Sequence, residues 1–427
     1  MTGTSFKSLS APWKGVELQL TRLSNGLELC VLTCRRAPIV STALFYGAGA
    51  SRDRVETTGT AHFLEHMMFR GSPHYGDGEI DEQTQSMGGS NNAFTSHDGA
   101  LYQFSFAGDT WTTALDVEAD RMRELTLDPV LFEAERAVIL EEISQHDDDP
   151  WDALEQEVFT RLYGSHPYSR PILGTREAID RVTVDHLREF HDRYYQPENA
   201  VLVVAGDVGR EAFDRIDRIL GGPARQTDPL KVGEDRPTVR PASRVRRSKG
   251  ETPRLLMAMP GPAATGKDYA PLRVVAAVLG LGRTSRLYRS LVDEAQYLAS
   301  VSVDVTETVL GGALLVSAEA LPGISLDRIE ESILNQLDLL AKQPPSDEEL
   351  ARARRLMKSD WVFSHQHAHQ LASTTAVALG LFGTSFLADH LQALQTVSPE
   401  AVQRAARHYL CPREVGVTGW SHSGLSG

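Results

Sequence analysis

Two histidines and a glutamate stand close together in an order that suits metal chemistry. His62 and His66 are four residues apart, so on a helix their imidazoles project from one face. From that face both rings can reach a single Zn²⁺ at about 2.0–2.1 Å. Glu65 lies beside the pair and can point at the open position of the metal. This His-x-x-Glu-His spacing is the inverted zincin motif, and it predicts a zinc site with a carboxylate general base.

A catalytic zinc ion also needs a third protein ligand and a position for water. Glu135, Glu141 and Glu142 follow on a segment whose spacing predicts a helix. Glu135 and Glu142 are two turns apart and therefore share a face. Charged residues on a helix are usually solvated, but the apolar run at 137–140 indicates a mostly buried helix. These residues alone leave the third ligand open among the three glutamates.

The surrounding segments alternate between strand and helix patterns. Residues 18–33 alternate apolar and polar side chains, with Asn25-Gly26 at a turn, which predicts a β-hairpin. Further strands are expected at 39–46, 101–106 and 201–205. Helices are expected at 60–69, 110–124, 131–145 and 184–195. The histidines therefore lie on one expected helix and the glutamates on another, within an α+β fold.

One segment near the middle of the chain has a different composition. Residues 221–253 hold five prolines, many charges and few large apolar side chains, which is typical of a linker. We expect an N-terminal zinc-binding domain at 1–222, a linker at 223–252 and a C-terminal domain at 253–427. The basic run at 236–249 is interpreted as solvated linker rather than as a nucleic-acid patch.

The central position of the linker suggests an internal duplication. A shift of 215 residues aligns several features without a gap. The helix expected at 131–145 falls on 346–360. Single residues that match in this way are Pro38 with Pro253, Thr183 with Ser398, Tyr194 with Tyr409 and Pro197 with Pro412. The constant offset predicts two similar α+β halves.

The second half lacks the residues of the zinc motif. Under the same offset, the positions of the two histidines, the base and Glu142 fall on Ala277, Gly280, Leu281 and Met357. No histidine occurs between residues 192 and 364. We therefore expect no equivalent zinc site in the second half, which would supply chamber wall and substrate contacts.

Three further histidines, His365, His367 and His369, alternate on a probable helical segment. His365 and His369 have the spacing of a ligand pair, but no glutamate stands between them and no third ligand is evident. We assign them no role.

The composition excludes several classes of protein. Lys and Arg number 43 against 57 Asp and Glu, so the net charge is −14. Non-specific nucleic-acid binding depends on clustered Lys and Arg, and we expect no nucleic-acid partner. The three cysteines, Cys30, Cys34 and Cys411, rule out a disulfide framework and fit a reducing compartment.

The apolar segments of the sequence are short. None reaches the about 18 residues that a membrane span needs. Residues 1–20 contain no run that resembles a signal-peptide core. We expect no membrane partner and a cytoplasmic location, or a periplasmic one if the start codon is mis-assigned.

Several motifs, in order, resemble the pitrilysin/insulinase (M16) family of zinc peptidases, in its short two-domain, processing-peptidase-like form. The matching segments are Gly59 to Gly71 with the zinc motif, Asn92-Ala93-Phe94-Thr95 with Tyr102, Glu135 to Glu142, Pro167 to Thr175 and Tyr194 to Asp207. The resemblance covers nearly the whole chain and is strong in residues 20–210. One departure is Ala100, where the family often has Thr.

The resemblance implies a role for each matching residue. His62, His66 and Glu142 would be the ligands of one zinc ion per chain, with Glu65 as the catalytic base. Glu135 would be a carboxylate that orients a ligand. Two residues, Asn92 and Ala93, would lie on an edge strand that pairs with the substrate backbone by β-augmentation.

These roles imply a zinc endopeptidase that cleaves peptides or unfolded polypeptide segments. Zinc lowers the pKa of a bound water toward about 7, Glu65 takes its proton, and the carboxyl returns it to the leaving amine. One alternative is a non-catalytic structural subunit of the same fold within a larger complex, although the intact motif argues against it. A metal-dependent hydrolase of small amides is a third reading.

The resemblance also bears on the oligomeric state. Many family members of this length dimerise, and their second half carries an Arg and a Tyr that hold the substrate backbone. After Ser285-Arg286-Leu287 these positions fall on Val292 and Ala299. Arg289 and Tyr297 are nearby but out of register. We expect a dimer, either a homodimer or a heterodimer whose homologous second subunit carries the Arg/Tyr clamp.

Overall fold

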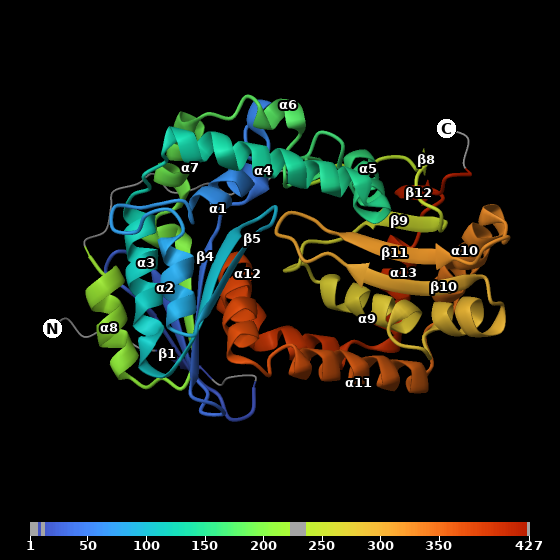
Figure 1. Cartoon of the computed structure of the whole chain (residues 1–427). Helices are drawn as coiled ribbons and strands as arrows, with labels where there is room; N and C mark the ends of the chain where they lie inside the picture. The colour runs from blue at the N-terminus through green and yellow to red at the C-terminus, as the bar shows by residue number, and fades with distance from the viewer. Residues whose placement is uncertain (1–6, 10–12, 223–235, 425–427) are drawn as a thin grey trace. The chain divides into compact units, whose positions relative to one another are not determined.

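The computed structural model describes residues 7–9, 13–222 and 236–424 of the 427-residue chain. It contains two mixed β-sheets with helices packed on them, which confirms the expected α+β fold (Figure 1).

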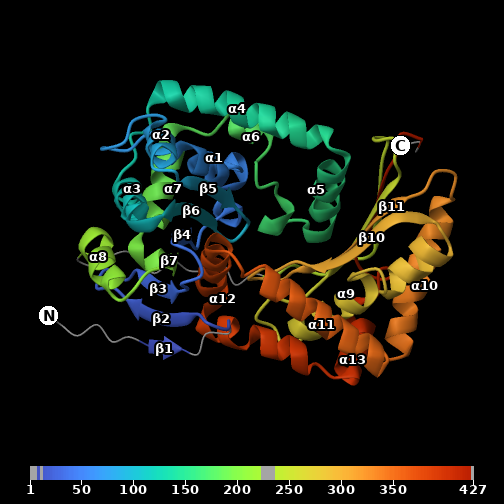
Figure 2. The same ribbon diagram turned by 60° about the horizontal axis from the view of Figure 1, so that its bottom comes forward.

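The first sheet has seven strands in the order β1-β2-β3-β7-β4-β6-β5, which Figure 2 shows in sequence. The strands are β1 (Lys7–Leu9), β2 (Glu17–Arg22), β3 (Glu28–Thr33), β4 (Ile39–Tyr46), β5 (Ser90–Thr95), β6 (Ala100–Ala107) and β7 (Ala200–Gly206). The β2–β3 hairpin, β4, β6 and β7 confirm the strand predictions. In contrast, β5 was not predicted as a separate element. It forms the edge of the sheet and pairs with β6 alone.

The helices of the N-terminal part follow the predicted order. They are α1 (Thr60–Met67), α2 (Glu79–Ser86), α3 (Thr112–Arg123), α4 (Pro129–Asp148), α5 (Pro150–Tyr163), α6 (Arg176–Ile179), α7 (Val184–Tyr194) and α8 (Glu211–Leu220). The apolar faces of α1, α3, α4 and α7 share one core with the sheet, including Phe63, Leu115, Ile139, Leu187 and Leu202. The helix with the histidines and the helix with the glutamates thus belong to the same core.

The second sheet has five strands in the order β10-β11-β9-β12-β8. Its strands are β8 (Ser243–Arg247), β9 (Arg254–Pro260), β10 (Leu298–Val305), β11 (Ala313–Ala320) and β12 (Val417–Ser421). The C-terminal helices are α9 (Tyr269–Gly280), α10 (Leu326–Lys342), α11 (Asp347–Phe363), α12 (Ala368–Thr396) and α13 (Pro399–Tyr409).

The two sheets repeat one topology. The order β3-β7-β4-β6-β5 in the first sheet corresponds to β8-β12-β9-β11-β10 in the second, and the pairs β3–β7 and β8–β12 are both parallel. The helices α7 and α13 differ by 215 residues at both ends, and α4 and α11 end 215 residues apart. The sequence offset therefore reports a true structural duplication.

The chain nevertheless divides into two compact units that are not contiguous in sequence. Unit 1 comprises Met1–Ile143, Pro171–Gly233 and Val362–Ala388, and unit 2 comprises Ser144–Arg170, Glu234–Trp361 and Asp389–Gly427. This division differs from the contiguous boundaries expected from the sequence. Each half contributes one helix to the core of the other, and an exchange of this kind depends on packing between distant residues.

Specific contacts explain the exchange. Leu154 and Val158 of α5 pack in one cluster with Leu256 and Val417 of the second sheet. In α12, the hydroxyl of Ser373 donates a hydrogen bond to the side chain of Gln103 on β6 at 2.5 Å. Because α5 and α12 are related by the 215-residue offset, the exchange is reciprocal.

The segment expected to be a linker is partly a strand. Residues 223–235 lie outside the described residues. Farther on, β8 (Ser243–Arg247) pairs in parallel with β12, and Val245 is buried under α5. The basic run is therefore not wholly solvated linker, as we had expected. Its arginines flank one buried apolar residue, because an edge strand needs only one buried side chain to pack while its neighbours face water.

Helix α12 is long and apolar enough, by length and composition, to cross a membrane. This differs from our expectation that no stretch would reach that length. Gly383 interrupts the helix with φ 79° and ψ −179°, so neither part alone reaches the about 18 residues of a span. Leu371, Ala372 and Leu379 are buried in unit 1, as expected for a core helix. The expected absence of a membrane partner stays a prediction.

Candidate metal centre

Helix α1 is held by an aspartate that precedes it in sequence. The buried carboxylate of Asp53 accepts hydrogen bonds from the backbone N–H groups of Gly59, at 2.7 Å, and Ala61, at 3.0 Å. These groups at the start of the helix have no partner within the helix itself. Gly59 has φ 92°, and a Cβ there would lie 2.5 Å from the carbonyl oxygen of Leu173. The position therefore requires glycine, and the entry to α1 is tightly defined.

Helix α4 is fixed against α1 by aromatic packing. The rings of Phe63 on α1 and Phe132 on α4 stack with centroids 4.6 Å apart and planes within 4°. Before α4, the carboxylate of Asp128 accepts hydrogen bonds from the N–H groups of Val130 and Leu131, and Pro129 occupies the first turn. Capping sets where α4 starts, and this in turn sets which glutamates face α1.

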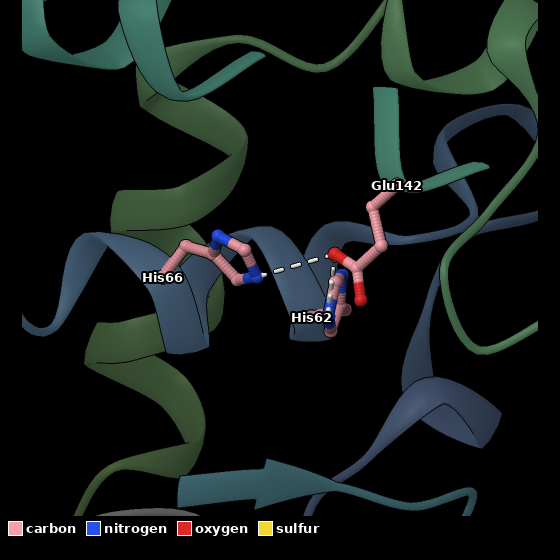
Figure 3. A group of neighbouring side chains, drawn as sticks. All are labelled: His62, His66 and Glu142. Atoms are coloured by element: carbon pink, nitrogen blue, oxygen red, sulfur yellow. Dashed lines mark ion pairs between the residues drawn. The ribbon is translucent and has the colours of Figure 1, made fainter. Parts of the chain in front are cut away.

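His62, His66 and Glu142 come together in the structure (Figure 3). The Oε2 atom of Glu142 lies 3.7 Å from Nε2 of His62 and 3.6 Å from Nε2 of His66. All three potential ligand atoms lie within 4.8 Å of one another. Glu141 is exposed and turned away from this group. Among the three candidate glutamates, the geometry selects Glu142 to complete the cluster.

The spacing of these atoms fits a metal ion better than direct hydrogen bonds. A separation of 3.6–3.7 Å is too long for a hydrogen bond between nitrogen and oxygen. Ligands placed 2.0–2.1 Å from a tetrahedral zinc ion stand about 3.3–3.4 Å apart, close to the observed separations. Two imidazoles and one carboxylate also form a donor set that suits zinc.

His66 is held in the orientation that a ligand needs. Its Nδ1 lies 2.7 Å from Oε1 of Glu135, whose other oxygen accepts a hydrogen bond from Nε of Arg70 at 2.6 Å. Arg70 also donates to Asp77 at 3.1 Å. A proton on Nδ1, shared with Glu135, leaves the lone pair of Nε2 directed at the cluster. Glu135, with only 5% of its side chain exposed, is thus placed to orient a ligand.

The electrostatic environment separates the two histidines. Burial, followed by the nearby charge of His66, lowers the pKa of His62 to about 3, so this imidazole is neutral. Burial also disfavours the charged form of His66, but the hydrogen bond to Glu135 outweighs it and raises the pKa. Burial opposes the ionisation of Glu135 too, yet the hydrogen bonds from His66 and Arg70 lower its pKa. A neutral His62 beside an ionised Glu135 suits metal ligation.

Glu65 lies on α1 between the two histidines and is 9% exposed. Burial raises the pKa of its carboxyl group, and a hydrogen bond from the hydroxyl of Thr95 opposes that rise. A carboxylate with a raised pKa is a better proton acceptor than an exposed one at neutral pH. The structure therefore places the expected base beside the metal-binding cluster, in a suitable environment.

The expected substrate-binding residues lie on β5, beside α1 (Figure 1). Asn92 is exposed, whereas Ala93 is half-buried and packs against the core of unit 1. Because β5 pairs only with β6, its other edge has no strand partner among the described residues. This geometry is compatible with an added peptide strand.

The corresponding positions of the second half carry no metal-binding group. Ala277 and Met357 are buried apolar residues. Within the described residues, the search for clusters of ligating side chains finds only the group of His62, His66 and Glu142. The histidines at 365, 367 and 369 form no such group, although the rings of His367 and His369 stack at 5.7 Å.

The two positions expected for a substrate clamp lie in unit 2. Val292 belongs to the π-helical segment η6 (Tyr288–Glu294), and Ala299 is exposed on β10. The neighbouring candidates have partners of their own. Arg289 pairs with Glu294 at 3.5 Å, and the guanidinium of Arg328 lies 4.8 Å from the ring centre of Tyr297.

Sequence reasoning missed three residues that support the cluster, namely Asp53, Arg70 and Thr95. Arg70 follows His66 by four residues, so the helical spacing alone could have suggested that it shares a partner with His66. Asp53 and Thr95 act from a loop and from a strand edge. No local spacing connects either of them to α1.

Comparisons with known protein families and relatives agree with this organisation. Residues 31–176 match the profile described as insulinase (peptidase family M16), and residues 181–357 match the peptidase M16 inactive domain. An uncharacterized zinc protease of Mycobacterium leprae is 30% identical over 311 residues, which cover 71% of this chain and 69% of that protein. The mitochondrial-processing peptidase subunit beta of Lentinula edodes is 26% identical, covering 95% and 90%.

A solved structure with the same fold is that of a protease from Helicobacter pylori. Its TM-score is 0.88 at 22% identity, and the match covers 98% of this chain and all of that one (100%). The similarity extends over both sheets, so the duplicated two-sheet architecture is shared with a solved protein.

Proposed function

Because the chain belongs to peptidase family M16, we propose that it is a zinc-dependent endopeptidase that cleaves peptides or unfolded polypeptide segments. The observation that carries the proposal is the convergence of His62, His66 and Glu142 with Glu65 beside them. Relatives named zinc proteases support the choice of metal and of reaction class. One zinc ion per chain is expected.

The residues divide the chemistry among them. When bound by His62, His66 and Glu142, zinc supplies an acidified water and polarises the scissile carbonyl group. Glu65 accepts a proton from the attacking water and passes it to the leaving amine. Glu135 keeps His66 in the ligating orientation. No serine or cysteine nucleophile is needed.

The substrate would bind as an added strand on β5. Asn92 and Ala93 would contribute backbone hydrogen bonds, which are independent of the substrate side chains. An extended backbone is available in peptides and unfolded segments and is already paired in folded sheets, which favours unfolded substrates.

The alternative is a non-catalytic core subunit of the same fold. Two measurements separate these functions: zinc content after dialysis against a weak chelator, and cleavage of a quenched fluorescent peptide. An endopeptidase retains about one zinc per chain and cleaves the peptide, and strong chelation abolishes cleavage. A protein that retains zinc but cleaves no peptide, alone or with a partner, would contradict the proposal.

We further propose that full activity requires a second, non-identical subunit of the same fold. The side chains of Val292 and Ala299 cannot donate hydrogen bonds to a substrate backbone, and Arg289 and Tyr297 already have other contacts. One relative is named as a subunit, the mitochondrial-processing peptidase subunit beta. A homologous subunit with an Arg/Tyr clamp would supply the missing donors.

Mixing tests this partnership. The isolated chain is assayed against a peptide library, and then with a homologous chain that carries the Arg/Tyr pair. We expect weak turnover alone and a large increase on mixing, with co-elution in size-exclusion chromatography. Full turnover by the isolated chain as a homodimer, unchanged on mixing, would rule out the heterodimer.

A further inference from the structure

The side chain of Glu65 has one printed hydrogen-bond partner, the hydroxyl of Thr95 on β5. The hydroxyl donates to Oε2 of the carboxylate. A buried carboxylate that accepts a hydrogen bond from a fixed donor loses freedom to rotate. Oε1 is then the oxygen free to face the cluster of His62, His66 and Glu142.

Thr95 occupies a rigid place. It is the last residue of β5 and pairs across the hairpin with Ala100, which is fully buried. Immediately after it, the carbonyl oxygens of Ser96 and His97 accept hydrogen bonds from the backbone N–H groups of Ala50, at 3.0 Å, and Ser51, at 2.9 Å. The position of the Thr95 hydroxyl is therefore defined from both sides of the turn.

The same short segment anchors α1. Ala50 and Ser51 hold the end of β5, and Asp53, two residues on, holds the first turn of α1. The strand end and the helix that carries Glu65 thus rest on one support. The contact between Thr95 and Glu65 closes this arrangement on the side of the metal cluster.

The side chains of β5 separate its two tasks. Thr95, Ala93 and Asn91 are half-buried and share one face, whereas Asn92 and Phe94 are exposed on the other. The backbone edge is available to a peptide, while the inward face reaches Glu65 through Thr95. A substrate strand that pairs with β5 therefore binds to the element that holds the base.

We propose that Thr95 is a positioning residue that fixes the carboxylate of Glu65 and couples the substrate-binding strand to the catalytic base. The proposal rests on the peptidase function given above. A hydroxyl is required at this position, and a methyl group of the same size should not replace it. Thr95 would therefore act on turnover rather than on substrate affinity.

Three variants test the effect on activity. T95V removes the hydroxyl at nearly constant volume, and T95S keeps it. We expect T95V to lower kcat by about 10–100-fold with little change in KM and full zinc content, and T95S to retain most of the wild-type kcat. The matched control is T42V, since Thr42 is a buried strand threonine of the same sheet whose hydroxyl has no hydrogen-bond partner.

A second measurement needs no turnover. In the zinc-free protein, the melting temperatures of T95V, E65A and the double variant form a thermodynamic cycle. We expect T95V to lower the melting temperature by about 2–4 °C when Glu65 is present and by less in the E65A background.

The outcomes separate this proposal from the proposed function. Wild-type kcat in T95V, or equal losses in T95V and T95S, would overturn the role of the hydroxyl while leaving the peptidase intact. If the wild-type protein, with or without a partner, cleaves no peptide, the peptidase function fails. The cycle in the zinc-free protein then still decides whether Thr95 holds Glu65, and additive shifts would refute it.

Discussion

The two sheets of this protein share one strand order, yet the described residues form a metal-binding cluster on only one of them. In the first half, α1 and α4 present His62, His66 and Glu142 to a common point. In the second half, the corresponding residues include buried Ala277 and Met357, which only fill space. The fold therefore persists with and without the site, which indicates that the site is not needed to hold the fold together.

The halves also use ion pairs differently. In the first half, Arg70 and Glu135 form a pair that orients His66. In the second half, Arg286 donates two hydrogen bonds to Glu349, at 2.7 and 2.9 Å, with no potential metal ligand beside them. One bidentate arrangement supports chemistry, and the other supports only packing. The following predictions test this contrast.

The largest effect is expected at the base. Glu65→Gln preserves all three ligand side chains but removes the proton acceptor. We expect zinc content to remain near wild type and kcat to fall by about 10²–10⁴-fold or more. Zinc analysis and single-turnover cleavage of a quenched peptide measure the two quantities. Substantial activity in a zinc-loaded Glu65→Gln protein would remove Glu65 from the mechanism.

The second effect concerns the third ligand. Glu142→Gln should weaken zinc binding by more than about 100-fold, the upper range for residues that only orient a ligand. Its neighbour Glu141 is exposed and turned away, so Glu141→Gln is a matched control that should bind zinc normally. Competition with a fluorescent chelator gives both affinities. Circular dichroism should show both variants folded without zinc, because the second sheet forms without such a site.

A smaller effect is expected from the ion pair in the first half. Arg70→Met leaves the buried carboxylate of Glu135 without one of its donors and loosens its hold on His66. We expect zinc affinity to fall by about 10-fold. Arg54→Met is the control, since Arg54 pairs with Glu189 on the exposed surface, away from the cluster. Equal zinc affinities in the two variants would show that Arg70 has no part in ligation.

Features that depend on local spacing could be predicted from the sequence. The four-residue spacing of His62 and His66 determines a helix face whatever the rest of the chain does. In the same way, the seven-residue spacing of Glu135 and Glu142 is enough to put them on one face of α4. The 215-residue offset survived as well, because α7 and α13 keep their length and caps.

Features that depend on distant packing could not be predicted. The exchange of α5 and α12 rests on contacts such as Leu154 with Val417, which are far apart in the chain. The strand β8 has one buried side chain, Val245, among arginines, too little pattern to suggest a strand. The bond from Thr95 to Glu65 joins residues on different elements, so neither sequence neighbourhood indicates it.

The smallest effect sharpens the contrast from the side of the second half. Hydrogen bonds from Arg286 lower the pKa of Glu349 from the ordinary 4.5 to about 2. Because the folded-state value is the lower one, the ionised pair stabilises the protein above about pH 4.5, and this contribution is lost as the pH falls toward about 2. The side chain of Glu349 is 22% exposed, so we expect a loss of about 1 kcal/mol.

Glu349→Gln removes this titration. Urea unfolding of the zinc-free proteins at pH 5 and pH 3 should therefore show a greater loss of stability for the wild type than for the variant, by about 1 kcal/mol. Zinc affinity at neutral pH should be the same in both, since the pair contacts no potential ligand. An equal loss in the two proteins would show that the pair contributes no pH-dependent stability. A change in zinc affinity would show that the halves are not chemically independent, contrary to the contrast drawn from their two sheets.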